Sequence, residues 1–133
     1  MTRQTRRGPR PQYNARVERQ QSARRIFSLD EASRLLPAVK AITTDAVRHV
    51  ERLSADLEGV PETDASRVAV EAKIAAVVRE WAGAIEALGL EAKGLWLVDF
   101  DNGEGYYCWS HPENTVSHFH DYDGGFRGRM KIV

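Results

Sequence analysis

Apolar residues recur every three or four positions along two segments of this sequence, which is the spacing of one face of an α-helix. The first stripe consists of Val39, Ile42, Ala46, Val50, Leu53 and Leu57. The second consists of Val70, Ile74, Val77, Trp81, Ile85 and Leu88, within a helix expected over about 64–88 and ended by Gly89. The connection between them, Gly59-Val60-Pro61, is short, so we expect an antiparallel helical hairpin.

Local signals mark where the first helix begins. Ser28 and Glu31 have the spacing of a capping box, in which each side chain accepts a hydrogen bond from the backbone N–H of the other residue. Pro37 lacks a backbone donor and disfavours helical geometry at Leu36. The first stretch, Leu29–Leu36, should therefore be a short separate helix or a first arm kinked against the rest.

The last third of the chain has the alternation and turn residues of short β-strands. Strand candidates are 95–100, 106–109 and 115–120, with turn segments at 101–105 and 111–114. The prediction is an α+β fold, in which the helical hairpin packs on a small three-stranded antiparallel sheet. We expect the glycine-rich segment 123–129 to close the fold, with Phe126 returning to the core.

Charge divides the chain into two regions, although the formal net charge of its 133 residues is zero. Residues 1–25 hold eight arginines and one glutamate, and the remaining 108 residues hold 11 basic and 18 acidic side chains. We expect 1–25 to be a flexible basic arm with little to bury, followed by one domain over 26–133, helical to residue 90 and β-rich beyond. Phosphate contacts from Arg3, Arg6, Arg7 and Arg10 would give weak nucleic-acid binding, and a solvated arm is the equal alternative.

Other features indicate a cytoplasmic protein with no membrane contact. No stretch approaches the roughly 18 consecutive apolar residues of a membrane-spanning helix, and no apolar segment of a secretory signal follows the basic start. Cys108 is the single cysteine, so the chain forms no internal disulfide, and a reducing compartment is expected.

Candidate chemistry gathers in the β-rich part. Because side chains alternate across a strand, His118 and His120 share one face of the sheet, and Asp99 lies opposite Val98 and Phe100. If the aromatic residues lie under the helices, then Asp99, Cys108, His118 and His120 gather on the other face.

Thiolate and imidazole groups are the usual ligands of zinc, with carboxylates as further ligands. The candidate metal ligands are therefore Cys108, His120 and either Asp99 or Glu113, with His111 and His118 ranked lower. The spacing lacks a paired Cys-x2-Cys, so a polar sheet face without metal is the main alternative. A weaker alternative is Cys108 as a nucleophile activated by a neighbouring histidine.

Several short segments, in this order, resemble the uncharacterised domain-of-unknown-function 2203 family of small bacterial proteins. They are 27–32 and 35–37, Leu88-Gly89, 93–95, 98–100, Cys108-Trp109, Glu113, His120, Gly125-Phe126 and Gly128-Arg129. The resemblance covers about 26–131 and implies a bacterial intracellular protein, but no activity. It singles out Asp99, Cys108, Glu113, His120 and Arg129. His111 and His118 do not coincide with positions of the family pattern.

Three functional hypotheses follow, and whether the protein is an enzyme stays open. The first is a binding or interaction domain that self-associates through its helices, since two helices and a small sheet leave apolar stripes incompletely covered. The second is a metal-binding protein or metal-dependent enzyme at the cluster around Cys108 and His120. The third is nucleic-acid association through the basic arm.

Overall fold

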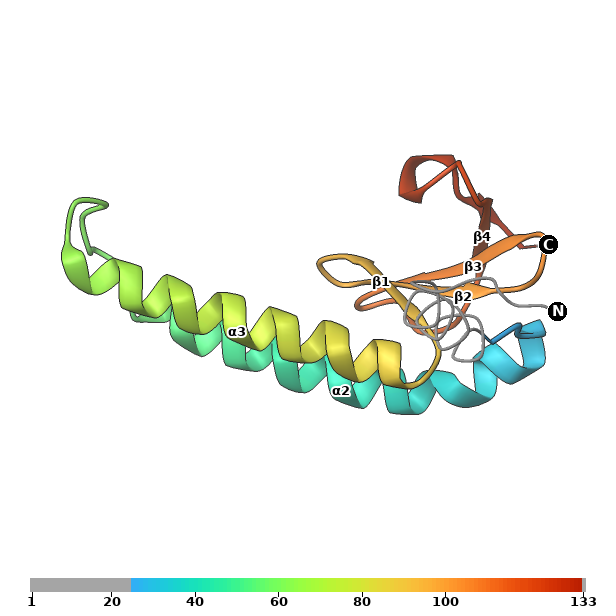
Figure 1. The fold of residues 1–133 in the computed structure, drawn as a ribbon, viewed down its shortest axis with the longest axis horizontal. Coiled ribbons are helices and arrows are strands. Elements are labelled where there is room, and N and C mark those ends of the chain that lie inside the picture. Colours follow the sequence, from blue (N-terminus) through green and yellow to red (C-terminus); the bar gives the residue numbers. More distant parts are fainter. Residues whose placement is uncertain (1–24, 133) are drawn as a thin grey trace, which may run out of the picture.

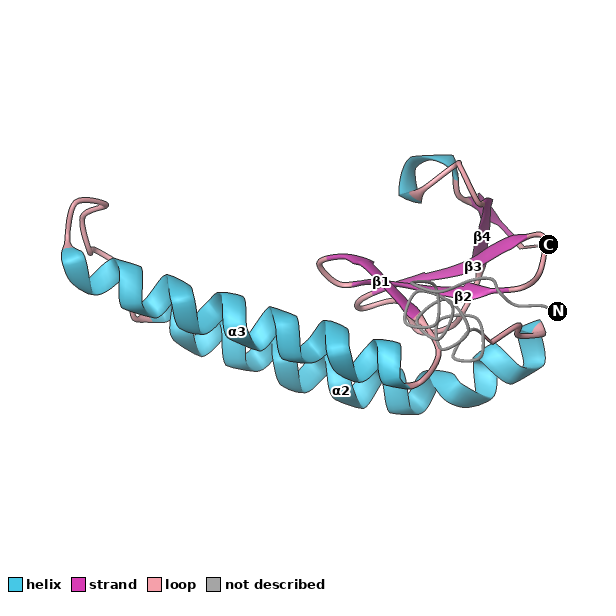
Figure 2. Cartoon of the chain, in the orientation of Figure 1, coloured by secondary structure: helices cyan, strands magenta, loops and turns pink. Residues whose placement is uncertain are grey.

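The computed structural model describes residues 25–132, in which two long helices pack against an antiparallel sheet (Figures 1 and 2). The helices are α2 (Leu29–Ala55) and α3 (Ala65–Ala87). The strands are β1 (Glu91–Gly94), β2 (Leu97–Asp101), β3 (Gly105–Ser110), β4 (His118–Asp121) and β5 (Met130–Lys131), with a short 3-10 helix, η2 (Phe126–Gly128), before β5. The arm arginines Arg3, Arg6, Arg7 and Arg10 lie outside the described residues.

Local signals marked the start of α2 and both ends of α3, whereas α2 ends at Ala55, before the expected Leu57. The Ser28 hydroxyl accepts from the Glu31 N–H, and the Glu31 carboxylate accepts from the Ser28 N–H, which completes the expected capping box. Asp64 caps α3 by accepting from Ser66 N–H, and Gly89 follows α3 with a φ of +85°, a value that suits glycine.

Pro37 does not divide the first helix. Of the two alternatives for Leu29–Leu36, the separate helix is wrong, because α2 runs through Pro37 as one helix; its first turns are bent against the rest, as the alternative of a kinked first arm predicted (Figure 1). The proline costs one backbone hydrogen bond, but it is exposed, so the carbonyl that loses its partner is on the solvent side. Buried Leu36 and Val39 hold the helix on both sides of it.

The sheet has five strands in the order β1-β2-β3-β4-β5, so the expectation of three strands is wrong. Both missed strands lie at the edges of the sheet. Glu91–Gly94 has no apolar alternation, and Met130–Lys131 is two exposed residues long. Such strands are defined by backbone pairing with a neighbour, which the pattern of side chains does not reveal. Leu95 and Trp96, expected to begin a strand, form the turn between β1 and β2.

The core lies between the helices and one face of the sheet. Val98, Phe100 and Trp109 on this face are fully buried and belong to the same apolar cluster as Val39 and Ile85 of the helices. Phe126 does not join this core, contrary to expectation. It is 47% exposed, because the glycine-rich segment lies over the other face of the sheet.

The helical hairpin extends well beyond the sheet (Figure 1). All buried residues of α2 lie at or before Ala46, and all buried residues of α3 lie at or after Val77. We call the intervening residues 47–76 the distal arm. Every residue of the distal arm is half-buried or exposed, because the sheet does not extend over it.

One buried hydrogen bond joins the two helices. Trp81 Nε1–H donates to the Thr43 hydroxyl at 2.9 Å, and both side chains are buried. The substitution Thr43→Val keeps the shape but leaves the indole N–H without its acceptor, and we expect a loss of about 1–3 kcal/mol in the free energy of unfolding. Urea denaturation measures it. Thr44→Val, at the half-buried next position, is the control and should change the value by less than about 0.5 kcal/mol.

Candidate metal site

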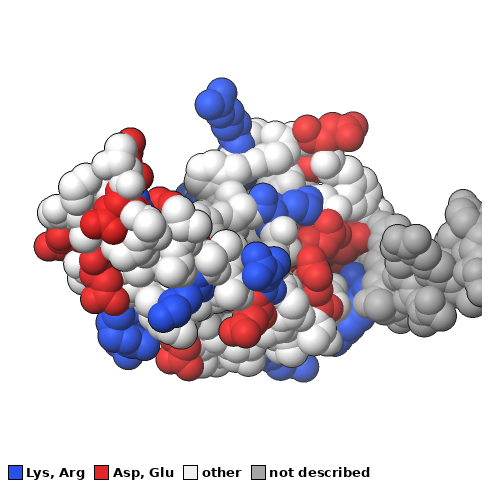
Figure 3. All heavy atoms as spheres, turned by 60° about the vertical axis from the view of Figure 1, so that its left-hand side comes forward, with Lys and Arg blue, Asp and Glu red and all other residues white. Residues whose placement is uncertain are grey.

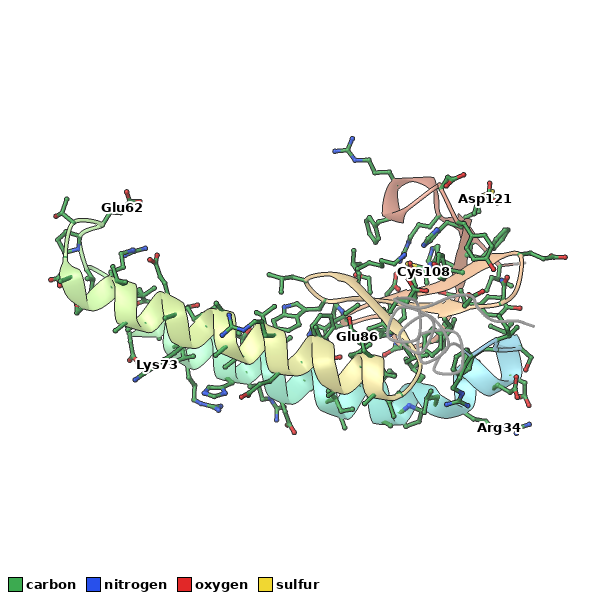
Figure 4. The ribbon with its side chains drawn as sticks, viewed as in Figure 1. Arg34, Glu62, Lys73, Glu86, Cys108 and Asp121 are labelled. Carbon is green, nitrogen blue, oxygen red and sulfur yellow. The ribbon has the colours of Figure 1, made fainter. Side chains whose placement is uncertain are left out.

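The strand register builds a polar face on the side of the sheet away from the helices. Cys108 in the central strand pairs with Asp99 of β2 on one side and His118 of β4 on the other. His120 lies two residues after His118 in β4, on the same face of the sheet, and pairs with Tyr106 of β3. Figure 4 shows Cys108 on this face, between the sheet and the segment that carries η2.

Three of the predicted site residues converge. One potential ligand atom each from Asp99, Cys108 and His120 lies within 4.8 Å of the other two, and all three side chains are at most 2% exposed. Each comes from a different strand, so the sheet itself holds the group. We call these three residues the triad.

The Asp99 carboxylate is only partly satisfied by hydrogen bonds. Its Oδ2 accepts from Lys93 Nζ at 3.2 Å and lies 3.0 Å from His120 Nε2. Its Oδ1 is the one buried side-chain polar atom without a hydrogen-bond partner among residues 25–132. A buried carboxylate oxygen without a donor is costly, so this atom marks a place where a positive partner would stabilise the protein.

The His120 ring is oriented by the main chain. Its Nδ1 lies 2.7 Å from the Asp121 carbonyl oxygen, which can only accept, so Nδ1 carries a hydrogen and donates it. The nitrogen left toward the triad is Nε2, which faces Asp99 Oδ2. Histidines that ligate metals commonly donate one ring N–H to a carbonyl and bind the ion through the other nitrogen, so a metal ion at Nε2 would replace its contact with Asp99.

The surroundings of Cys108 keep it as a thiol. Burial, and next the negative charge of Asp99, raise the pKa of the Cys108 thiol to about 11, and Arg129 opposes this only in part. A catalytic nucleophile needs a lowered thiol pKa and access to solvent. These surroundings therefore oppose the alternative of a nucleophilic cysteine. A bound metal cation would instead deprotonate the thiol directly.

A pocket of about 240 Å³ opens onto the triad. Besides the triad, it is lined by Lys93, Leu97, Gly125 and Phe126. Lys93 brings an ammonium group, and Leu97 and Phe126 bring apolar surface. The triad is thus buried in the sheet and forms the inner wall of this pocket.

Sequence comparison places these residues in a known family. A family model described as "Uncharacterized conserved protein (DUF2203)" matches residues 25–132. This chain belongs to the DUF2203 family. The predicted resemblance is confirmed, and the match spans every element from α2 to β5, with the triad inside it. Searches of curated proteins and of solved structures gave no match.

Two further residues that the DUF2203 resemblance singled out, Glu113 and Arg129, pair with each other, and Arg129 contacts the triad. Arg129 pairs through both terminal nitrogens with the two oxygens of Glu113, and its Nη1 also lies 3.7 Å from Cys108 Sγ. Glu113 is thus engaged by Arg129 and is not part of the triad. Glu113 was an alternative to Asp99 as ligand, and the geometry favours Asp99.

The two histidines outside the DUF2203 pattern do not join the triad. His118 shares its face, but its Nδ1 lies 3.2 Å from the Ser117 hydroxyl and 3.1 Å from Arg129 Nη2. His111 packs edge-on against Trp109, with 6.1 Å between ring centres.

Sequence reasoning missed Lys93 as part of this site. Its ammonium bonds Asp99, lies 3.5 Å from a Glu91 carboxylate oxygen and sits 4.1 Å above the Tyr106 ring. Burial lowers the pKa of Lys93, but the hydrogen bond to Asp99 and the negative charges of Asp99 and Glu91 together outweigh burial and raise the pKa, which keeps Lys93 charged. Lys93 lies in the Lys93-Gly94-Leu95 segment of the DUF2203 resemblance, and that was the signal that could have found it.

The burial of Cys108 predicts slow thiol chemistry in metal-free protein. A rise of its pKa from 9.0 to about 11 lowers the fraction of thiolate at pH 8 by roughly a hundredfold relative to an ordinary cysteine. Steric protection by burial slows the reaction further. Iodoacetamide should therefore modify native protein at least about a hundred times more slowly than protein unfolded in urea. Mass spectrometry of EDTA-treated samples measures both rates. Equal rates would contradict this description of the thiol.

Proposed function

We propose that this DUF2203 protein binds one divalent transition-metal ion, with zinc favoured, through Cys108 Sγ, His120 Nε2 and the carboxylate of Asp99. The unpartnered, buried Oδ1 of Asp99 beside a thiol and an imidazole carries the proposal. Soft sulfur, borderline nitrogen and one carboxylate form a donor set that suits zinc better than magnesium or calcium.

Charge balance supports a divalent ion. With metal bound, Cys108 would be a thiolate and Asp99 a carboxylate. Glu91 balances the charge of Lys93 beside them, so the two ligands offset a 2+ cation. Without metal, Cys108 keeps its proton, and the triad holds one buried carboxylate with an unpartnered oxygen. Metal binding therefore removes an unfavourable buried group as well as forming coordinate bonds.

The pocket favours a metal that takes part in chemistry or ligand binding over a purely structural one. Structural zinc sites are closed by four protein ligands, whereas catalytic sites have three and keep one position for water or substrate. The triad offers three ligands, and the pocket of about 240 Å³ lies over it. A small molecule entering past Leu97 and Phe126 would reach the open position of the ion.

Metal content of protein purified without an affinity tag tests the proposal. After loading with Zn²⁺ and dialysis, we expect about one equivalent per chain by elemental analysis. Cys108→Ala removes the sulfur ligand and should weaken binding by more than the roughly 10- to 100-fold cost of losing an outer-shell contact.

His111→Ala is the control, because this histidine lies outside the triad and packs against Trp109. It should keep the full equivalent of zinc. Thermal melts check that both variants are folded. Wild-type protein that retains less than about a tenth of an equivalent would overturn the proposal.

A second candidate function, self-association through the helices, is favoured by the distal arm. None of its residues, 47–76, is buried, although its stripes are apolar, and Val68 is 68% exposed. Two arms packed together would form a four-helix bundle and cover these stripes. This mode of association is independent of the metal site, which lies on the opposite face of the sheet.

Light scattering at micromolar concentration should give about twice the 15.0 kDa chain mass if the arms pair. Val68→Lys places a charge on the distal arm and should shift the equilibrium between dimer and monomer toward the monomer. Leu95→Lys changes a residue of similar exposure, 62%, in the turn between β1 and β2, and should leave the mass unchanged. A monomeric wild-type protein would contradict the idea.

The remaining expectations stay predictions. Nucleic-acid contact through the basic arm, residues 1–25, concerns residues that almost all lie outside those described. On the face in Figure 3, acidic and basic side chains are interspersed, so the charge of this part of the fold adds no continuous basic surface. None of the helices in residues 25–132 is long and apolar enough to cross a membrane. The bacterial, cytoplasmic setting is an inference from the family resemblance and the single free cysteine.

A further inference from the structure

A largely buried arginine contacts the sulfur of the triad. Arg129 has a side chain only 13% exposed, and its Nη1 lies 3.7 Å from Cys108 Sγ. Burying a guanidinium beside a neutral thiol gains little, because a thiol is a weak acceptor. The same contact to a thiolate is a charge-assisted hydrogen bond.

Glu113 holds Arg129 in this position. The carboxylate receives both terminal nitrogens of the guanidinium, and its Oε1 also accepts from the Ser110 N–H at 2.9 Å. Burial opposes the charge on Glu113, but the hydrogen bonds from Arg129 and Ser110 outweigh it and lower the pKa of Glu113. Trp109 Nε1–H donates to the Glu113 carbonyl at 2.8 Å and fixes the backbone of this loop.

We propose that Arg129 is a positioning residue for a metal-bound thiolate, and that Glu113 orients it and balances its charge. The inference rests on the proposed metal site at Cys108. When the metal displaces the thiol proton, the Arg129 N–H donates to a negatively charged sulfur in a dry environment. The contact is then stronger in the metal-bound state than in the metal-free state, so it raises metal affinity.

The charge of Glu113 is necessary for this arrangement. A guanidinium alone beside a divalent cation would repel it, because the two positive charges face each other at low dielectric. Paired with Glu113, Arg129 presents an N–H donor with little net charge. The two residues therefore act as one unit, and their effects on metal affinity should not be additive.

Cobalt reports on this contact directly, because Co²⁺ replaces Zn²⁺ in such sites and gives a sulfur-to-metal charge-transfer band. Titration of metal-free Arg129→Met with Co²⁺ should show about 10- to 100-fold weaker binding than wild type. The band should move to longer wavelength, because the sulfur electrons are no longer stabilised by an N–H donor. Arg127→Met, which changes an exposed arginine of η2, is the control and should match wild type.

Glu113→Gln completes the test. Alone it leaves the guanidinium uncompensated and should weaken Co²⁺ binding, but in the Arg129→Met background it should have much less effect. If Arg129→Met binds Co²⁺ more weakly but its charge-transfer band does not move, Arg129 supports only the fold and the inference is wrong. Additive effects of Arg129→Met and Glu113→Gln on Co²⁺ affinity would also overturn it. Wild-type protein that binds no Co²⁺ would overturn the metal site itself, whereas normal binding with an unaffected Arg129→Met variant overturns this inference alone.

Discussion

The buried carboxylate of Asp99 is the group around which the polar face of the sheet is arranged. An ionised carboxylate removed from water costs several kcal/mol unless positive or hydrogen-bonding partners replace the lost solvent. Lys93 and His120 supply such partners for Oδ2, and Oδ1 has none among the described residues. The neighbouring Cys108 responds to the same charge, since Asp99 contributes to its raised pKa. A cation in the triad would satisfy both groups.

The site depends on the core on the other side of the sheet. Val98, Phe100 and Trp109 can be buried under the helices only if β2 and β3 pair in one register, because a slip by one residue would turn every side chain to the opposite face. That register places Asp99 directly opposite Cys108. Apolar packing against α2 and α3 thus fixes the polar cluster without touching it, and the geometry of the site is tied to the stability of the core.

The three strands that carry the triad and the glycine-rich segment 123–129 contribute different parts of the site. The strands supply the three side chains of the triad, whereas the segment that follows β4 contributes Gly125 and Phe126 to the pocket wall and leads to Arg129. Variation in this loop would change what enters the pocket without changing the triad. For a DUF2203 protein, the activity has to be argued from this local chemistry, since a small α+β fold is compatible with many functions.

Local patterns in the sequence determined the helices, their ends and the two faces of the sheet, because capping, helical spacing and strand alternation depend on residues close together in the chain. They were sufficient to set Asp99, Cys108 and His120 on one face. The tertiary structure decided the rest. Edge strands β1 and β5 exist through backbone pairing, and α2 tolerates Pro37 because packing of its neighbours offsets one lost hydrogen bond. Distance in space, which the sequence pattern does not encode, assigned Glu113 to Arg129 and Lys93 to Asp99.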